Sequence, residues 1–219
     1  MEEHYVFEME NVSFSYGITS ETTADFALHC HNYYEVYYFA EGDVEYLVEG
    51  QKYVPAPDSV ILIAPHVFHG VKINSDRPYR RFSLHFDPNV LSLERRTLLC
   101  SAFPFLSKVP QQKVYFENAR RYHISTYFYA LMEYRVLDQT LQRELFPVGA
   151  EALLSQIVCM SSAETGALST HADTIFEIIW YLNKNPQKRH FPGPAVRAVS
   201  HQQASPEQDL PQGHRDHHF

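Results

Sequence analysis

The sequence predicts an α+β fold, in which an N-terminal antiparallel β-barrel or sandwich precedes a helical region and a disordered C-terminal tail. Short apolar or alternating runs, separated by turn residues, recur at roughly 8–12-residue spacing as far as Pro88. Beyond Pro88 apolar residues recur at three- and four-residue steps, which is the helical period. From Pro186 onward the chain is rich in Pro, His and Gln and has one leucine. Such a segment cannot offset the entropy lost on ordering.

The composition is that of a globular protein. The 219 residues are 45% apolar and include 15 Tyr and 15 Phe. No apolar run approaches the ~20 residues of a membrane span, and the amino terminus lacks the pattern of a signal peptide, so we expect a cytoplasmic protein without membrane contact. The three cysteines show neither a disulfide nor a zinc pattern. The net charge of −8 disfavours binding to a phosphate backbone.

The strands are predicted in order along the first 90 residues. Loose alternation over 6–28 indicates short strands, and Gly42-Asp43 marks a turn before the alternating run 44–48. The run 60–64 is continuously apolar and bounded by a proline, which is typical of a strand buried on both faces. Alternation returns over 81–86.

The stretch from His29 to Gly42 is predicted to be one strand that lines a pocket. Successive side chains of a strand point to opposite faces. One face then carries His29, His31, Tyr33, Glu35, Tyr37 and Phe39. Two imidazoles, a carboxylate and flat aromatic walls on one face are typical of a ligand site. The alternative for the three aromatic residues is plain barrel core.

Three helices are predicted after the strands, over 118–137, 141–160 and 171–185, with a polar linker at 161–169. Pro147 is expected near a first turn, where proline costs little. The first helix has an apolar stripe made of Tyr122, Thr126, Tyr129, Met132 and Val136. We expect this stripe to lie in the core, and the alternative is a dimer surface. One side of the second helix is marked by Leu145, Val148, Ala152 and Gln156.

The histidine stretch matches the first cupin motif, with His29-x-His31, three residues, Glu35, six residues and Gly42. The second cupin motif is poorer. Only His69 holds its place, whereas its glycine, proline, glycine and asparagine positions are taken by Asp58, Ala64, His66 and Ile73.

The chain resembles the effector-binding domain of AraC-type transcription regulators. The resemblance is specific over 25–90 and is limited to the general helical pattern over 91–185. The resemblance is carried by the cupin motif, Tyr34-Glu35-Val36-Tyr37-Tyr38-Phe39, Pro65, His69 and Leu84-His85-Phe86-Asp87. It implies a cupin-like effector-binding barrel over 1–90, a helical dimerisation or linker region over 91–162, and the first helix of a DNA-binding domain over 170–185. The tail, 186–219, is then aberrant.

The missing helix-turn-helix is predicted to have been lost by a reading-frame slip. Reading the degenerate codons from His190 one base later permits about 26 consecutive residues that resemble the first helix-turn-helix of an AraC-type domain, ending in Leu-Ser-Arg-Ile-Tyr-Arg-Lys-Ala-Thr-Gly. The alternative is a genuine disordered tail. Sequencing the gene across codons 183–192 distinguishes the two.

We expect an effector site made of His29, His31, Tyr33, Glu35, Tyr37 and His69. A metal site of His29, His31, Glu35 and His69, suited to Fe, Mn, Ni or Zn, remains an alternative, as does a purely structural polar network. His66 and His85 are expected to be ordinary surface or edge residues. No nucleophile and base are paired by sequence, so we expect neither a catalytic residue nor a cofactor.

The resulting interpretation is the effector-sensing and dimerisation part of an AraC-type regulator whose DNA-binding domain is incomplete. It would bind a small metabolite, such as a sugar, and form a homodimer, while promoter DNA would be engaged by the full-length relative and not by this chain. The competing classes are a metal-dependent cupin enzyme, either an isomerase or a dioxygenase, and a stand-alone sugar-binding module.

Overall fold

The computed structural model describes residues 3–104 and 112–165, which form two antiparallel sheets and a set of helices. The predicted α+β class, with strands first and helices after them, is confirmed. The strands are β1 Glu3–Met9, β2 Val12–Thr19, β3 Tyr34–Glu41, β4 Val44–Val48, β5 Gln51–Tyr53, β6 Ser59–Ile63, β7 His69–Ile73, β8 Tyr79–Phe86 and β9 Tyr115–Phe116. The predicted helix 171–185 and the tail 186–219 lie outside the described residues.

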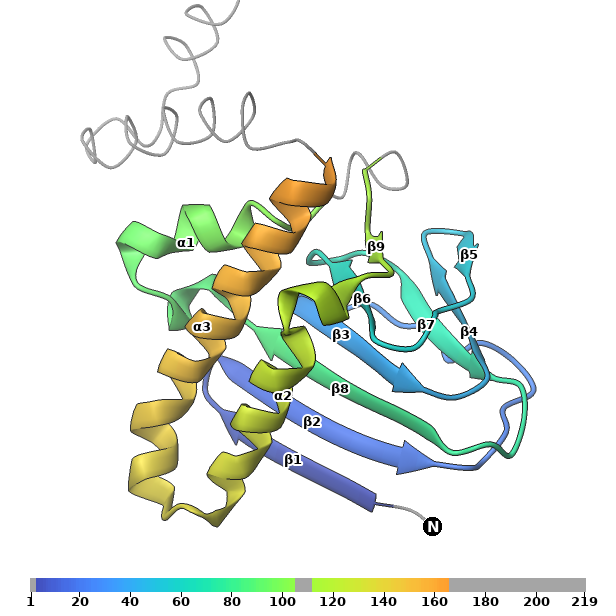
Figure 1. The fold of residues 1–219 in the computed structure, drawn as a ribbon, viewed down its shortest axis with the longest axis horizontal. Coiled ribbons are helices and arrows are strands. Elements are labelled where there is room, and N and C mark those ends of the chain that lie inside the picture. The colour runs from blue at the N-terminus through green and yellow to red at the C-terminus, as the bar shows by residue number, and fades with distance from the viewer. Residues whose placement is uncertain (1–2, 105–111, 166–219) are drawn as a thin grey trace, which may run out of the picture. The chain divides into compact units, whose positions relative to one another are not determined.

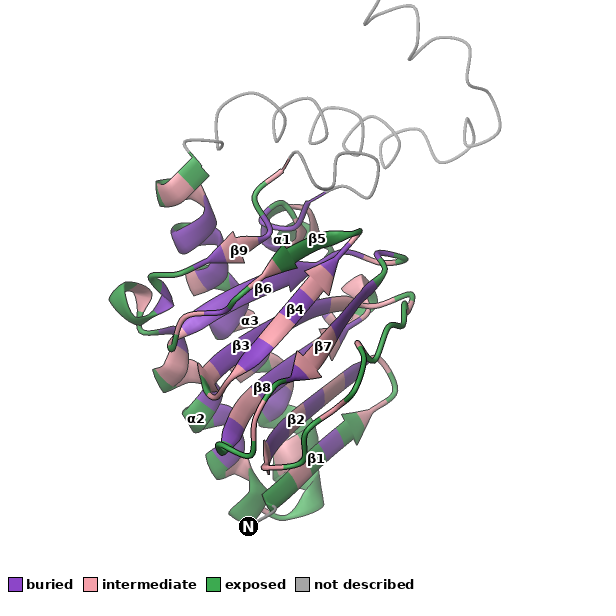
Figure 2. Cartoon of the chain, turned by 90° about the vertical axis from the view of Figure 1, so that its right-hand side faces the viewer, coloured by how far each residue is buried: buried purple, intermediate pink, exposed green. Residues whose placement is uncertain are grey.

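The larger sheet has the strand order β1-β2-β8-β3-β6-β9 and the smaller one β5-β4-β7, and every pairing is antiparallel. Figure 2 shows the smaller sheet in front of the larger one. Gly42 makes the turn between β3 and β4 with φ 141°, and a Cβ there would lie 3.0 Å from the Cα of Tyr79. Only glycine fits this turn without strain.

Each strand of the larger sheet divides its side chains between two cores. On β3, Tyr37 and Phe39 join the core between the two sheets, while Val36 and Tyr38 join the core beneath the helices. β6 is buried at every position, which confirms the prediction of a strand buried on both faces. The alternation of the strands therefore decides which residues can reach the space between the sheets.

The helices cover the outer face of the larger sheet (Figure 1). The α-helices are α1 Leu93–Cys100, α2 Ile124–Glu133 and α3 Gln139–Thr165, and short 3-10 turns lie at η1 Pro88–Val90, η3 Ala119–Tyr122 and η4 Tyr134–Val136. The predicted helix 118–137 is interrupted at His123, which has φ 56°. The stripe predicted for its core face is wrong at Thr126, Tyr129 and Val136, which are exposed. Met132 is buried and the half-buried Tyr122 packs against the core, but the buried face of α2 is otherwise made of Ile124, Phe128 and Leu131.

The helix α3 is longer than predicted and extends to Thr165, so the linker expected from residue 161 begins no earlier than the end of this helix. Pro147 lies inside α3 and not in its first turn, which removes one backbone hydrogen bond there. Among the described residues α3 alone is long and apolar enough to cross a membrane, but Phe146, Leu153 and Ile157 are packed in the core. Core packing thus accounts for its apolar character.

Candidate functional site

The two motif histidines precede β3 and do not belong to it. The prediction of a single strand from His29 is wrong, since β3 begins at Tyr34 and His29 forms an isolated bridge with His69. The backbone N–H of each residue of this bridge donates to the carbonyl of the other, at 2.9 and 3.0 Å. Gly70 allows this segment to cross, because a Cβ there would lie 2.5 Å from the carbonyl oxygen of Ala27. The crossing brings His29 over β7.

Glu35 is the centre of the site. It is buried, and its Oε2 lies 3.2 Å from Nε2 of His31, 3.0 Å from Nε2 of His69 and 3.4 Å from Nε2 of His85. Burial alone would raise the pKa of this carboxyl, but the contacts with the three imidazoles outweigh it and hold the pKa well below its usual range. Glu35 is therefore a buried carboxylate anion.

The pKa of His69 is shifted in the opposite direction to that of Glu35. Burial favours the neutral ring, but Glu35 and the carbonyl of Val67 favour the charged ring, so the pKa of His69 is raised. Although its Nε2 is within ion-pair distance of Glu35, that atom has no hydrogen-bond partner among the described residues. The two atoms are close but not aligned for a hydrogen bond.

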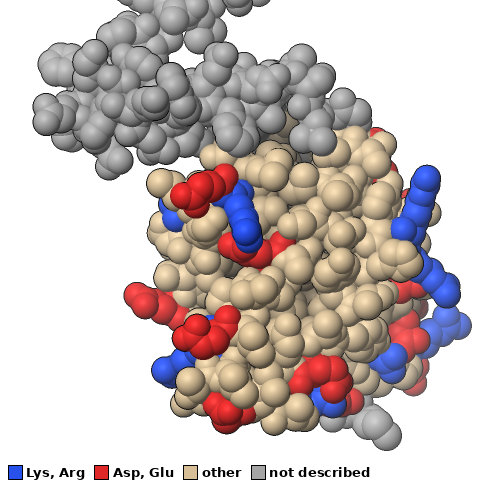
Figure 3. All heavy atoms as spheres, turned by 60° about the vertical axis from the view of Figure 1, so that its left-hand side comes forward, with Lys and Arg blue, Asp and Glu red and all other residues tan. Residues whose placement is uncertain are grey.

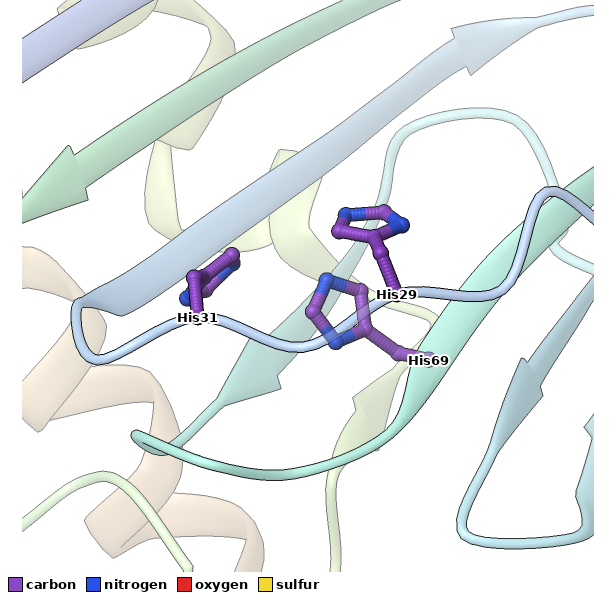
Figure 4. A group of neighbouring side chains, drawn as sticks. All are labelled: His29, His31 and His69. Atoms are coloured by element: carbon purple, nitrogen blue, oxygen red, sulfur yellow. The ribbon is translucent and has the colours of Figure 1, made fainter.

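Three of the imidazoles are held by the backbone in the same way. The Nδ1 atoms of His29, His31 and His69 lie 3.0, 3.0 and 2.8 Å from the carbonyl oxygens of Ala27, Tyr33 and Val67. A proton on Nδ1 would donate to each carbonyl and leave Nε2 free to accept a ligand or metal. Figure 4 shows the three rings gathered from the segment before β3 and from the start of β7.

The site has the donor set of a metal centre. Ligand atoms of His29, His31 and His69 lie within 4.8 Å of one another, and so do those of His31, Glu35 and His85. The buried Nε2 of His69 without a hydrogen-bond partner also fits a metal ligand. Such a set would suit a transition metal acting as a Lewis acid.

Tyrosines form the wall next to this cluster. The hydroxyls of Tyr37 and Tyr79 are 2.7 Å apart, and the rings of Tyr37 and Tyr46 are tilted with centroids separated by 4.6 Å. Tyr46 is also parallel to His69. Burial, the largest effect, raises the pKa of Tyr37 and Tyr46 well above the ordinary value, so both phenols are neutral. Tyr33 lies on the half-buried bend before β3, beside the ring of His31.

The sequence interpretation missed His85, which is neither a surface nor an edge residue. It is 27% exposed in its side chain, contacts Glu35, and lies opposite Glu35 in the pairing of β3 with β8. The alternation over 81–86 contained the signal, because it places His85 on the face opposite to Leu84 and Phe86. His66 is exposed, as predicted.

Two residues that replace glycines of the motif to which the sequence was compared have a backbone conformation typical of glycine. Asp58 and His66 stand at the two glycine positions of that motif and have φ 61° and 66°, the left-handed conformation that glycine adopts freely. The turns on both sides of β6 are therefore made at the expense of backbone strain. This strained turn at His66 leads directly to His69.

Among the comparisons with known proteins, the family model identifies a ligand-binding domain. The family model of the AraC-like ligand binding domain matches residues 11–158. No curated protein matches the sequence.

Solved structures give weak similarities. A conserved protein of unknown function from Streptococcus pyogenes is 9% identical, with a TM-score of 0.35 over 40% of this chain and 75% of its own. A cupin 2 conserved barrel domain protein from Salinispora arenicola is 15% identical, with a TM-score of 0.34 over 39% of this chain and 76% of its own. KdgF from Halomonas is 16% identical, with a TM-score of 0.34 over 41% of this chain and 85% of its own. The assignment rests on the family model, which covers more than half of the chain: the protein belongs to the family that carries an AraC-like ligand binding domain.

Proposed function

We propose that this domain is the small-molecule sensor of a cytoplasmic AraC-type transcription regulator. Its effector is a sugar or a related metabolite, which the domain binds but does not convert. The observation that carries the proposal is the buried Glu35 with imidazoles around it, beside a wall of tyrosines on the face between the sheets. Polar groups that fix orientation and aromatic groups that supply contact area are what a small-molecule site needs. The effector would contact His29, His31, Tyr33, Glu35, Tyr37 and His69 within a barrel formed by residues 1–90.

A thermal-shift screen of sugars against the purified protein tests this site, since a ligand that binds only the folded state raises the melting temperature. We expect a stabilising sugar whose effect is lost in His31→Ala. Lys52→Ala is the control, because Lys52 is exposed on β5 outside the site. A stabilising sugar whose effect is equal in both variants would contradict the proposal.

We also propose that α3 joins two copies of the chain in a homodimer, with residues 91–162 as the dimerisation region. Exposed residues without charge recur on α3 at steps of four and three: Leu141, Leu145, Val148, Ala152, Ser155 and Cys159. This is the spacing of a coiled-coil seam, which a second copy of the same helix would match. The face that carries the helices is also mostly uncharged (Figure 3).

Sedimentation or light scattering of Val148→Glu tests the dimer. Val148 is 65% exposed on the α3 stripe, and Val136, which is 73% exposed outside it, supplies the control Val136→Glu. We expect Val148→Glu to shift the protein to monomer and Val136→Glu to leave it dimeric. A monomeric wild-type protein, or equal behaviour of the two variants, would refute the seam.

The link to transcription is supported by the resemblance over 91–185 and by the shifted-frame string from His190. We propose that the regulator engages promoter DNA through the helix-turn-helix of that string, and that residues 186–219 as translated do not replace it. Specific, salt-sensitive binding of DNA in a gel shift by a protein that carries residues 186–219 as translated, without the string, would refute the second statement.

A metal-dependent cupin enzyme is the second candidate, and the Nε2 of His69 without a hydrogen-bond partner favours it. His29, His31, Glu35 and His69 would hold the ion. Elemental analysis of protein purified without an affinity tag tests this. Stoichiometric Fe, Mn, Ni or Zn that is lost in His69→Ala would favour the enzyme, whereas substoichiometric metal would favour the sensor.

A further inference from the structure

Small and polar side chains line the inner face of the larger sheet beyond the histidine cluster. In the pairing of β2 with β8, Ser13 lies opposite His85, Ser15 opposite Ser83 and Gly17 opposite Arg81. The intervening residues of both strands pack beneath the helices. This part of the inner face is thus polar, in contrast to the aromatic wall on β3.

Arg81 is held on this face by its neighbours. Its Cζ lies 5.2 Å from the centre of the Tyr79 ring, and its Nη1 would lie 3.2 Å from a Cβ on Gly17. The absence of a side chain at Gly17 makes room for the guanidinium. Since Tyr79 belongs to the core between the sheets, Arg81 is directed into the same space as Tyr37.

The polar groups of this region are not satisfied within the described part of the protein. Arg81 is half-buried and makes no ion pair or hydrogen bond through its side chain there, and the hydroxyl of Ser83, which is 5% exposed as a residue, makes no hydrogen bond. Glu35, buried on the same face, is already engaged by three imidazoles. A half-buried guanidinium without a charged partner favours an anion.

The region is open towards solvent at the edge of the sheet. β1 is the edge strand, and its residues that face the same way, His4, Val6 and Glu8, are exposed. The smaller sheet therefore does not cover β1, and this uncovered edge is the side from which we expect a ligand to approach Arg81.

We propose that Arg81 binds the carboxylate of the effector, so that the effector is a polyhydroxylated carboxylic acid, such as a sugar acid, and not a neutral sugar. This inference rests on the proposed sensor function and deepens it. One guanidinium matches one carboxylate through two parallel hydrogen bonds. Ser83 and Ser15, one pair along the strands from Arg81, are placed to bond the hydroxyl groups of the ligand.

Isothermal titration of the full chain with matched pairs, D-glucuronate against D-glucose and D-galacturonate against D-galactose, tests the proposal. We expect at least one acid to bind at least ~10-fold more tightly than its neutral partner, the effect of one charge-assisted contact. Arg81→Gln should lose at least ~10-fold in affinity for that acid and Arg81→Lys somewhat less, because a lysine lacks the fork geometry. Arg80→Gln is the control, since Arg80 pairs with Glu41 at 3.2 Å and lies on the other face of β8.

Gly17→Ala is a second variant that keeps the charge and displaces it, and it should also weaken acid binding if Arg81→Gln fails to fold. Neutral sugars that bind as tightly as the acids would overturn this inference while leaving the sensor function intact. Acid binding that is unchanged in Arg81→Gln, or no binding of either acid, would also overturn it. No binding of acids and neutral sugars alike would count against the sensor function too.

Discussion

Glu35→Gln tests whether the buried carboxylate is bound to charged imidazoles. The change keeps the shape of the side chain and removes its charge, leaving His69, whose side chain is fully buried, without a counter-ion. Removing one partner of a buried ion pair costs about 3–5 kcal/mol. Because His69 can release its proton and keep its bond to the Val67 carbonyl at 2.8 Å, part of this cost is relieved. We therefore expect a loss of about 2–3 kcal/mol in the free energy of unfolding near pH 5.5.

The pH dependence of this loss follows from the two pKa shifts. The pKa of His69 is raised in the folded state, so its stabilising effect is complete below the unfolded pKa of about 6.5 and is lost as the pH rises through the folded value. The pKa of Glu35 is lowered, so its effect is present above the unfolded value of about 4.3 and is lost as the pH falls through the folded value. The difference between wild type and variant should be largest between these limits and smaller at pH 8.5.

Urea denaturation of protein treated with a chelator, at pH 5.5, 7 and 8.5, measures the effect without a contribution from bound metal. Glu45→Gln is the control, because Glu45 forms a surface pair with Lys52 at 2.7 Å and such pairs contribute about 0–1 kcal/mol. The reasoning fails if Glu35→Gln costs no more than the control at pH 5.5. It also fails if the loss is the same at pH 5.5 and pH 8.5.

Three further predictions concern stability and are measured by the same denaturation assay. Gly70→Ala would place a Cβ 2.5 Å from the carbonyl of Ala27, so it should cost about 1–3 kcal/mol, and an unchanged midpoint would contradict the crossing geometry. Phe128→Ala should lower the free energy of unfolding by about 3–5 kcal/mol because Phe128 is fully buried. The control Leu93→Ala, at a residue that is 58% exposed, should change it by about 0.5 kcal/mol or less. Equal losses in the two variants would be inconsistent with the core described above. His66→Gly should leave stability unchanged or raise it by up to about 1 kcal/mol, since it relieves a φ of 66°, and a loss would show that the histidine side chain contributes more than the strain costs.

Local spacing determined much of the barrel and part of the site. The alternation over 44–48 and 81–86 lies within β4 and β8, and the apolar run 60–64 coincides with β6 except at Ala64, which follows the strand. Side-chain direction along a strand follows from backbone geometry alone. His31 and Glu35 are four residues apart and contact each other, although a bend before Tyr34 separates them where one strand was predicted. Their short separation keeps them close in either conformation.

Helix faces were less predictable, because an amphipathic helix can bury either of two stripes when both contain apolar residues. In α2 the buried face contains Ile124 and Phe128, not Tyr129. In α3, Leu145 and Val148 face away from the core that Phe146 and Leu153 enter. The choice depends on which side the sheet occupies, and that information lies outside the helix itself.

The sequence by itself determined that strands precede the helices, which residues alternate over 44–48 and 81–86, and a cluster of His29, His31, Glu35 and His69 as the likeness to the cupin motif implied. Only the tertiary structure decided that His85 faces Glu35 and that Arg81 lies over Gly17 without a charged partner in the described chain. Both depend on the register of β8 between β2 and β3. Register joins residues about 50 to 65 positions apart, and it follows from how the whole sheet buries its two faces rather than from any local pattern.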